Sequence, residues 1–197
     1  LGMVPVADTN LTNKKYVDDE VNAGVADAIA VSNSYTDSKH PVLTAPIDLT
    51  GTTGATISGI PAGTALLELI LDGVSLPTDG VLVTVGPAGG PETSGYVGSS
   101  TAATQGSSTT GTGINTNGWR FMNVAGGVIT GGMQIRISNS STNRWTQTHN
   151  GNLSSGAESS VVGAGSKSLA GALTQVRISS MGGVELFTSG TVNARYA

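Results

Sequence analysis

The sequence of 197 residues has no cysteine, two histidines and few charged side chains, which make up 11% of the chain. Without cysteine the chain can form neither disulfides nor thiolate metal sites. The two histidines lie far apart and the acidic residues are scattered, so the sequence contains no metal-ligand spacing. We therefore expect no metal site and no cofactor.

The net charge and the absence of long apolar runs set two further limits. A net charge of −4 argues against nucleic acid as the main partner, because phosphate contacts need a basic surface. No apolar run approaches the roughly 20 residues that cross a bilayer, so we expect no membrane insertion. The first residues have neither a basic head nor an apolar core and do not indicate a signal peptide. Because the chain opens on Leu1, we expect it to be a piece of a longer protein.

What the sequence does contain is 29 glycines, many serines and threonines, and a hydrophobic fraction of 38%. This combination is typical of many short strands joined by tight turns, and it argues against disorder. Nine of the 22 charged residues fall within residues 1–40, which marks a boundary near residue 41. We expect an N-terminal extended segment and helix over 1–40, a linker over 41–56 and a β-domain over 57–197.

The first segment predicts a helix that begins near residue 13, with Thr12 as its N-cap, and ends before Pro41. Its apolar and small residues recur with a 3.5-residue period, which is the signature of a coiled-coil seam. β-Branched side chains in the seam favour three chains. So short a helix is marginal alone and needs a fused domain that holds the chains together. The alternative is a helix that lies on its own β-domain. The expected seam consists of Val17, Val21, Gly24, Ala28, Val31 and Tyr35.

The remaining chain predicts about nine short strands and therefore a mainly β fold, an antiparallel β-sandwich or jelly roll. Residues 65–71 are the most apolar run, and we expect a strand buried on both faces there. Residues 99–118 are mostly Ser, Thr, Gly and Ala, and Ile114 is their only large apolar side chain. We therefore expect a long loop there. Further strands are predicted at 81–85, 93–97, 119–122, 133–137 and 144–147.

The last third of the chain predicts a long strand and a closing hairpin. Within residues 165–178, Val176 and Ile178 fall on one face of a strand, and Gln175 and Arg177 fall on the other. In the final stretch, Phe187, Val192 and Tyr196 supply the hairpin with apolar side chains to bury.

Five segments of the chain occur in a definite order. They are Gly-Ile-Pro at 59–61, Leu-Asp-Gly-Val-Ser at 71–75, Glu-Thr-Ser-Gly-Tyr at 92–96, and the runs 165–178 and 186–196. As an ordered set, over residues 57–197, they resemble the C-terminal receptor-binding tip domain of bacteriophage tail fibres. The resemblance implies a homotrimer in the virion, joined to an upstream fibre shaft. It implies binding of a bacterial surface glycan or an outer-membrane protein. The chain departs from the family in its 99–118 stretch and in lacking a basic-aromatic strand after Pro61.

Two other functions stay open: a tailspike-type polysaccharide depolymerase and a purely structural trimerisation cap. A hydrolase needs a nucleophile beside a base, and the only histidines are His40 and His149, so we expect no enzyme activity and no catalytic residues. For receptor binding, aromatic rings can stack on sugars and arginines can reach hydroxyls. We expect loops to make the contact, residues 99–118 among them, and Trp145 to serve packing. The candidate receptor-binding residues are Tyr96, Trp119, Arg120, Arg144 and His149.

Overall fold

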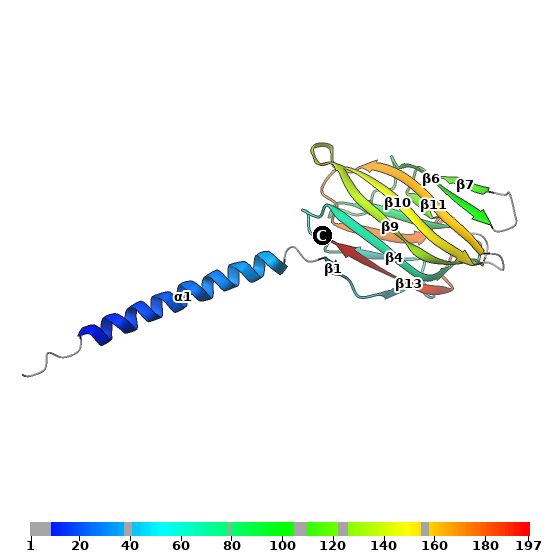
Figure 1. Ribbon diagram of the computed structural model, residues 1–197. Helices are drawn as coiled ribbons and strands as arrows, with labels where there is room; N and C mark the ends of the chain where they lie inside the picture. The colour runs from blue at the N-terminus through cyan, green and yellow to red at the C-terminus, as the bar shows by residue number, and fades with distance from the viewer. Residues whose placement is uncertain (1–8, 38–40, 79, 105–109, 122–125, 155–157) are drawn as a thin grey trace, which may run out of the picture. The chain divides into compact units, whose positions relative to one another are not determined.

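A computed structural model describes residues 9–37, 41–78, 80–104, 110–121, 126–154 and 158–197. The chain divides into two compact units, residues 1–40 and residues 41–197. The first unit is one helix and the second is a β-sandwich (Figure 1).

Helix α1 (Thr9–Asp37) is the whole described part of the first unit. The predicted helix is present, but it begins before Thr12, so this residue lies within the helix and is not its N-cap. The seam residues Val21 and Val31 are 56% and 70% exposed, and Gly24 and Ala28 are exposed as well. The side chains of Val17 and Tyr35 lie outside the described part. In the described part of the chain, no helix is long and apolar enough to cross a membrane.

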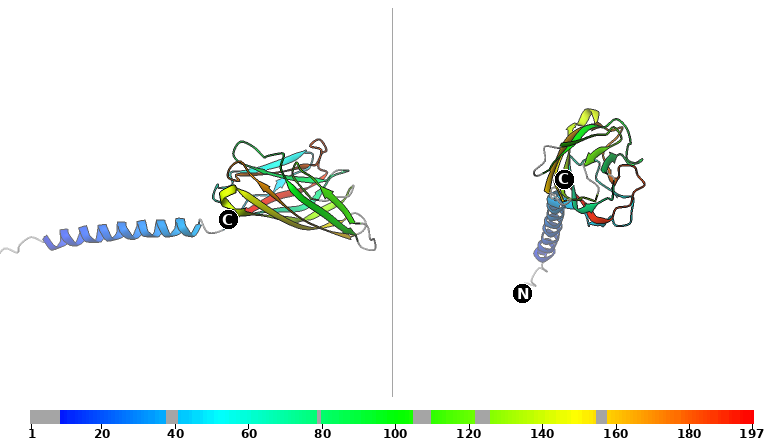
Figure 2. Two further views of the ribbon diagram at one scale, coloured as in Figure 1. Left: turned by 90° about the horizontal axis from the view of Figure 1, so that it is seen from above. Right: turned by 90° about the vertical axis from the view of Figure 1, so that its right-hand side faces the viewer.

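The second unit is an antiparallel β-sandwich, as predicted. The end-on view of Figure 2 shows strands surrounding its core. The larger sheet has the order β1-β13-β4-β9-β10-β11-β6-β7, and β2 pairs with β13 beside it. Its strands are β1 (Val42–Leu43), β2 (Ile47–Asp48), β4 (Leu66–Ser75), β6 (Val97–Thr104), β7 (Thr110–Ile114), β9 (Val128–Asn139), β10 (Arg144–Ser154), β11 (Glu158–Ser168) and β13 (Ser189–Tyr196). The smaller sheet has the order β3-β12-β5-β8, with β3 (Gly54–Ser58), β12 (Gln175–Ser180), β5 (Val81–Gly86) and β8 (Trp119–Phe121).

Two segments contain more strands than expected, since residues 41–56 were expected to be a linker, with one short strand in residues 47–60, and residues 99–118 a long loop. The described strands number thirteen. Residues 41–56 contain β1, β2 and the start of β3, and Leu49 among them is fully buried, so this segment belongs to the sandwich and is no linker. Within residues 99–118, β6 and β7 pair as an antiparallel hairpin. Its inward positions hold small residues such as Ser100 and Ala102, which give almost no hydrophobic signal in the sequence.

The core side of each sheet follows from the alternation of side chains along the strands. In β4, Leu67, Leu69 and Leu71 are buried while their neighbours are partly exposed, so this strand is buried on one face and not on both. The strand buried throughout is β5, whose six residues all lie in the core. The short strand expected at 93–97 is wrong, because β6 begins only at Val97.

The last third of the chain contributes one strand to each sheet. Val176 and Ile178 of β12 are buried and Gln175 and Arg177 are half-buried, so the predicted faces are confirmed. The closing hairpin is wrong, because β12 lies between β3 and β5 while β13 pairs with β4 in the other sheet. The segment between β12 and β13 therefore crosses from the small sheet to the large one.

Candidate functional site

Three of the five candidate receptor-binding residues lie inside the sandwich. The side chains of Tyr96, Trp119 and His149 are buried in the core. A side chain enclosed between two sheets does not meet a receptor, so in this fold these residues serve packing. Trp145, which was expected to serve packing, is also buried.

Tyr96 anchors the segment that precedes β6. Its hydroxyl accepts a hydrogen bond from the Val85 amide at 2.8 Å and donates one to the Glu92 carbonyl at 3.0 Å. Its ring meets the Trp119 ring edge to face, with centroids 5.2 Å apart. Burial raises the pKa of the Tyr96 hydroxyl, which therefore stays protonated.

An ion pair lies beside the Tyr96 ring. The Lys167 ammonium pairs with the Glu92 carboxylate and lies 5.5 Å from the centre of the Tyr96 ring. Burial raises the pKa of Glu92, but hydrogen bonds from Lys167 and the Ala170 amide outweigh it, so the pKa lies below its ordinary value. The Glu-Thr-Ser-Gly-Tyr segment is therefore a structural anchor.

His149 sits in a buried polar row. Its Nε2 lies 2.8 Å from Ser100 Oγ, its Nδ1 lies 3.0 Å from Gln147 Oε1, and its ring stacks on Phe121 with centroids 4.5 Å apart. Burial lowers the pKa of His149 to about 4, so the ring is neutral at pH 7. The row resembles a serine–histidine pair with a third orienting group, but Ser100 is fully buried and Gln147 carries no charge to stabilise an imidazolium. This cluster offers no nucleophile to a substrate.

Glycines on the inner face of the large sheet make room for these rings. A β-carbon on Gly163 would overlap the His149 ring, and one on Gly165 would lie 2.7 Å from Trp119. On β10, a β-carbon at Gly151 would lie 3.1 Å from the Phe121 ring. The glycine-rich strands and the large rings therefore fit together as one core.

The two candidate arginines are less enclosed and lie on different sheets. Arg120 of β8 is half-buried beside Gly80, where a β-carbon would lie 3.1 Å from its Nε. Arg144 is exposed at the start of β10, after the short 3₁₀ helix η1 (Ser140–Thr142), and its Nη2 lies 3.4 Å from Ser166 Oγ. The strand order does not bring them into one site with the buried rings.

The outer face of the large sheet carries rows of short polar side chains, placed side by side by the strand register. One row runs across six strands through Arg195, Glu68, Gln134, Thr148, Ala164 and Ser99. The next row runs through Asn193, Ile70, Gly132, Asn150, Val162 and Thr101. In the second row Gly132 leaves one position without a side chain.

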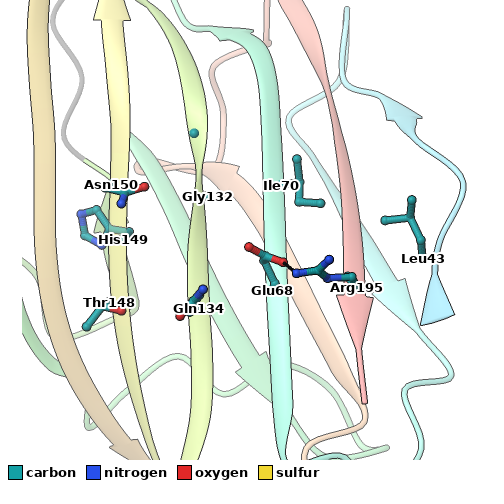
Figure 3. Close-up of a pocket in the computed structure, with 10 residues that line it drawn as sticks. Leu43, Glu68, Ile70, Gly132, Gln134, Thr148, His149, Asn150 and Arg195 are labelled. Carbon is teal, nitrogen blue, oxygen red and sulfur yellow. Dashed lines mark ion pairs between the residues drawn. The ribbon is translucent and has the colours of Figure 1, made fainter. Parts of the chain in front are cut away.

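That position lies in the lining of a hollow of about 610 Å³, which we call the Gly132 hollow. Figure 3 shows Gly132 on β9 between Ile70 on β4 and Asn150 on β10. An ion pair between Glu68 and Arg195, with 2.6 Å between Oε2 and Nη2, borders one side. The hollow is lined by Leu43, Glu68, Ile70, Gly131, Gly132, Gln134, Thr148, His149, Asn150 and Arg195.

The lining offers hydrogen-bond donors and acceptors around a small aliphatic patch. Asn150 and Gln134 provide both kinds of group, Glu68 accepts and Arg195 donates. Such a mixture suits an uncharged ligand rich in hydroxyl or amide groups. Among the described residues, no group of acidic or histidine side chains could hold a metal ion.

The sequence contains one signal for this hollow that hydrophobic periodicity does not reveal. Gly131 and Gly132 are consecutive glycines inside an otherwise alternating strand. Glycine weakens a strand interior and often marks the close approach of a ligand or another backbone.

Comparison of the chain with protein-family models, with curated proteins and with solved structures finds no match. The resemblance to tail-fibre tips therefore rests on the five segments named above.

Proposed function

We propose that the chain is the tip of a bacteriophage tail fibre, which assembles as a homotrimer and binds a bacterial surface glycan through the outer face of its large sheet. The observation that carries the proposal is the Gly132 hollow, set in two rows in which polar side chains such as Gln134, Thr148 and Asn150 stand among aliphatic ones. Short polar side chains on a rigid sheet can match the hydroxyls of a sugar chain at little cost in entropy.

The helix supports the assembly. Val21, Val25, Ile29 and Val31 are all more than half exposed. Val21 and Val31 belong to the seam of 3.5-residue period, and Val25 and Ile29 widen it on one side. An exposed apolar stripe of this kind favours pairing with other copies of the helix. Three tips on one fibre would convert weak single contacts into avidity, which suits a shallow hollow.

Two measurements on the full chain test the proposal. Light scattering is expected to give the mass of three 19.6 kDa chains at micromolar concentration. Fluorescently labelled chain is expected to attach to intact cells of at least one strain in a panel of bacteria, and to lose attachment when surface polysaccharide is stripped.

The other outcomes separate the alternatives. Attachment that survives stripping indicates an outer-membrane protein as the receptor. Release of soluble oligosaccharides from the purified polysaccharide indicates a depolymerase. A trimer that attaches to no strain in the panel indicates a structural cap and contradicts the proposal, as does a monomer.

A further inference from the structure

The Gly132 hollow is not explained by the needs of the fold. Gly132 does not have a positive φ, and the nearest described atom to a β-carbon built there is the Leu69 carbonyl oxygen, at 3.3 Å. Its neighbour Gly131 differs, because a β-carbon there would overlap the Asn150 carbonyl oxygen and lie 2.5 Å from Gly151 Cα. Folding therefore requires glycine at position 131, whereas at position 132 it imposes only the tight 3.3 Å approach to the Leu69 carbonyl oxygen, although glycine weakens the strand.

The empty position is small and has an apolar wall. Neighbouring side chains on paired strands stand about 5 Å apart, so the position over Gly132 itself takes a methyl group, while the rest of the hollow of about 610 Å³ has room for the sugar ring that carries it. Ile70 stands directly beside Gly132 in the register, and Leu43 also lines the hollow. Both side chains are aliphatic and offer a methyl group an apolar contact.

Polar groups surround this wall at the adjoining positions. Asn150 stands on the other side of Gly132, and its side-chain amide can donate to a carbonyl oxygen. Glu68 bonds Arg195 through Oε2, and a carboxylate accepts further hydrogen bonds, for example from an amide N–H. Because Arg195 neutralises Glu68, the rim does not select a charged ligand.

No Trp, Tyr or Phe is among the described residues of the lining, and the His149 ring is turned into the core against Phe121, so a sugar finds no ring to stack on. Recognition then depends on a substituent that carries a methyl group, a carbonyl oxygen and an N–H together. We infer that the Gly132 hollow binds the acetamido group of an N-acetylated hexosamine, with the methyl over Gly132 against Ile70. This inference rests on the proposed function and specifies its ligand.

Ligand-observed NMR on the full chain tests the inference. The probes are methyl glycosides of N-acetylglucosamine and N-acetylgalactosamine, each compared with its parent hexose, which carries a hydroxyl in place of the acetamido group. We expect the strongest saturation transfer to the acetamido methyl of at least one probe, and a dissociation constant about tenfold below that for its parent hexose.

Two variants separate filling of the hollow from a change of the surface in general. Gly132→Val occupies the methyl-sized position over residue 132 with a side chain that favours strands, and Ala164→Val adds apolar volume on the same face outside the lining. We expect Gly132→Val to abolish the acetamido signal and Ala164→Val to retain it. Circular dichroism and light scattering check that both variants keep the wild-type fold and mass, and Asn150→Ala serves as a second variant that leaves the backbone unchanged.

The results distinguish a failure of the inference from a failure of the proposed function. Equal binding of N-acetylated and parent sugars, or an unchanged signal in both Gly132→Val and Asn150→Ala, overturns the inference while attachment to cells still supports a receptor-binding tip. Absence of attachment to every strain and of binding to every sugar overturns both.

Discussion

On the inner face of the large sheet glycines stand against large rings, whereas on its outer face Gly132 stands in an open row. Gly163 and Gly165 of β11 are required by the rings of His149 and Trp119. Gly132 of β9 meets no such demand. The same residue type thus builds a core on one face and a hollow on the other, and its neighbours across the strands decide which.

The strongest test of this comparison is to replace one glycine on each face by alanine and to compare the losses in stability. Gly163→Ala would overlap the His149 ring and lie 2.5 Å from the Ser99 carbonyl oxygen, so we expect the free energy of unfolding to fall by about 3 kcal/mol. Gly132→Ala should change it by less than about 1 kcal/mol. Urea unfolding at one fixed protein concentration measures both, and equal losses would mean that the faces are assigned wrongly.

The inner face should also respond to acid through His149. Its pKa is lowered from 6.5 to about 4 in the fold, so the unfolded chain binds the proton first as the pH falls. Stability is therefore complete above pH 6.5 and decreases below it, by about 2 kcal/mol between pH 6.5 and 5. The slope should flatten in His149→Gln but persist in the control His40→Gln. A slope that stays the same in His149→Gln would assign it to other groups.

The ion pairs Lys167–Glu92 and Arg195–Glu68 should show the smallest difference in stability between a buried and an exposed position. Lys167 is 7% exposed and Arg195 is 53% exposed. Lys167→Met removes the buried cation that pairs with Glu92, and because the Glu92 side chain is 22% exposed and can be hydrated, we expect a loss of about 1 kcal/mol. Arg195→Met should cost about 0.5 kcal/mol or less, because water screens the exposed pair. Double-mutant cycles with Glu92→Gln and Glu68→Gln give the coupling energies, and a larger value for the exposed pair would contradict this ranking.

The sequence predicted the strands that alternate large apolar and polar residues, such as Val176 and Ile178 in β12. It did not predict the hairpin of β6 and β7, because Ser100 and Ala102 carry too little apolar surface to show a period. Small inward residues are recognisable only when the rings that fill the space beside them are known.

The candidate site was missed for a related reason. Rings and arginines next to turns were expected to reach a receptor, but the pairing of β10 with β11 and of β11 with β6 encloses His149 beside Ser100. Such pairings join residues far apart in sequence, so local patterns do not report them. The hollow itself arises from a side chain that is missing, and composition alone does not show where a glycine faces.

The positions of β12 and β13 determine when the sandwich can form during synthesis. β12 lies between β3 and β5 in the small sheet, and β13 lies between β1 and β4 in the large one. Until the ribosome has released residues 175–196, the small sheet lacks its central pairing and β4 has no partner on one side. The sandwich must then fold after most of its strands have emerged. Its contacts join residues far apart in sequence, and proteins with such contacts fold slowly. Exposed strand edges during that interval favour association with other chains, so in the proposed trimer folding and assembly would be coupled steps.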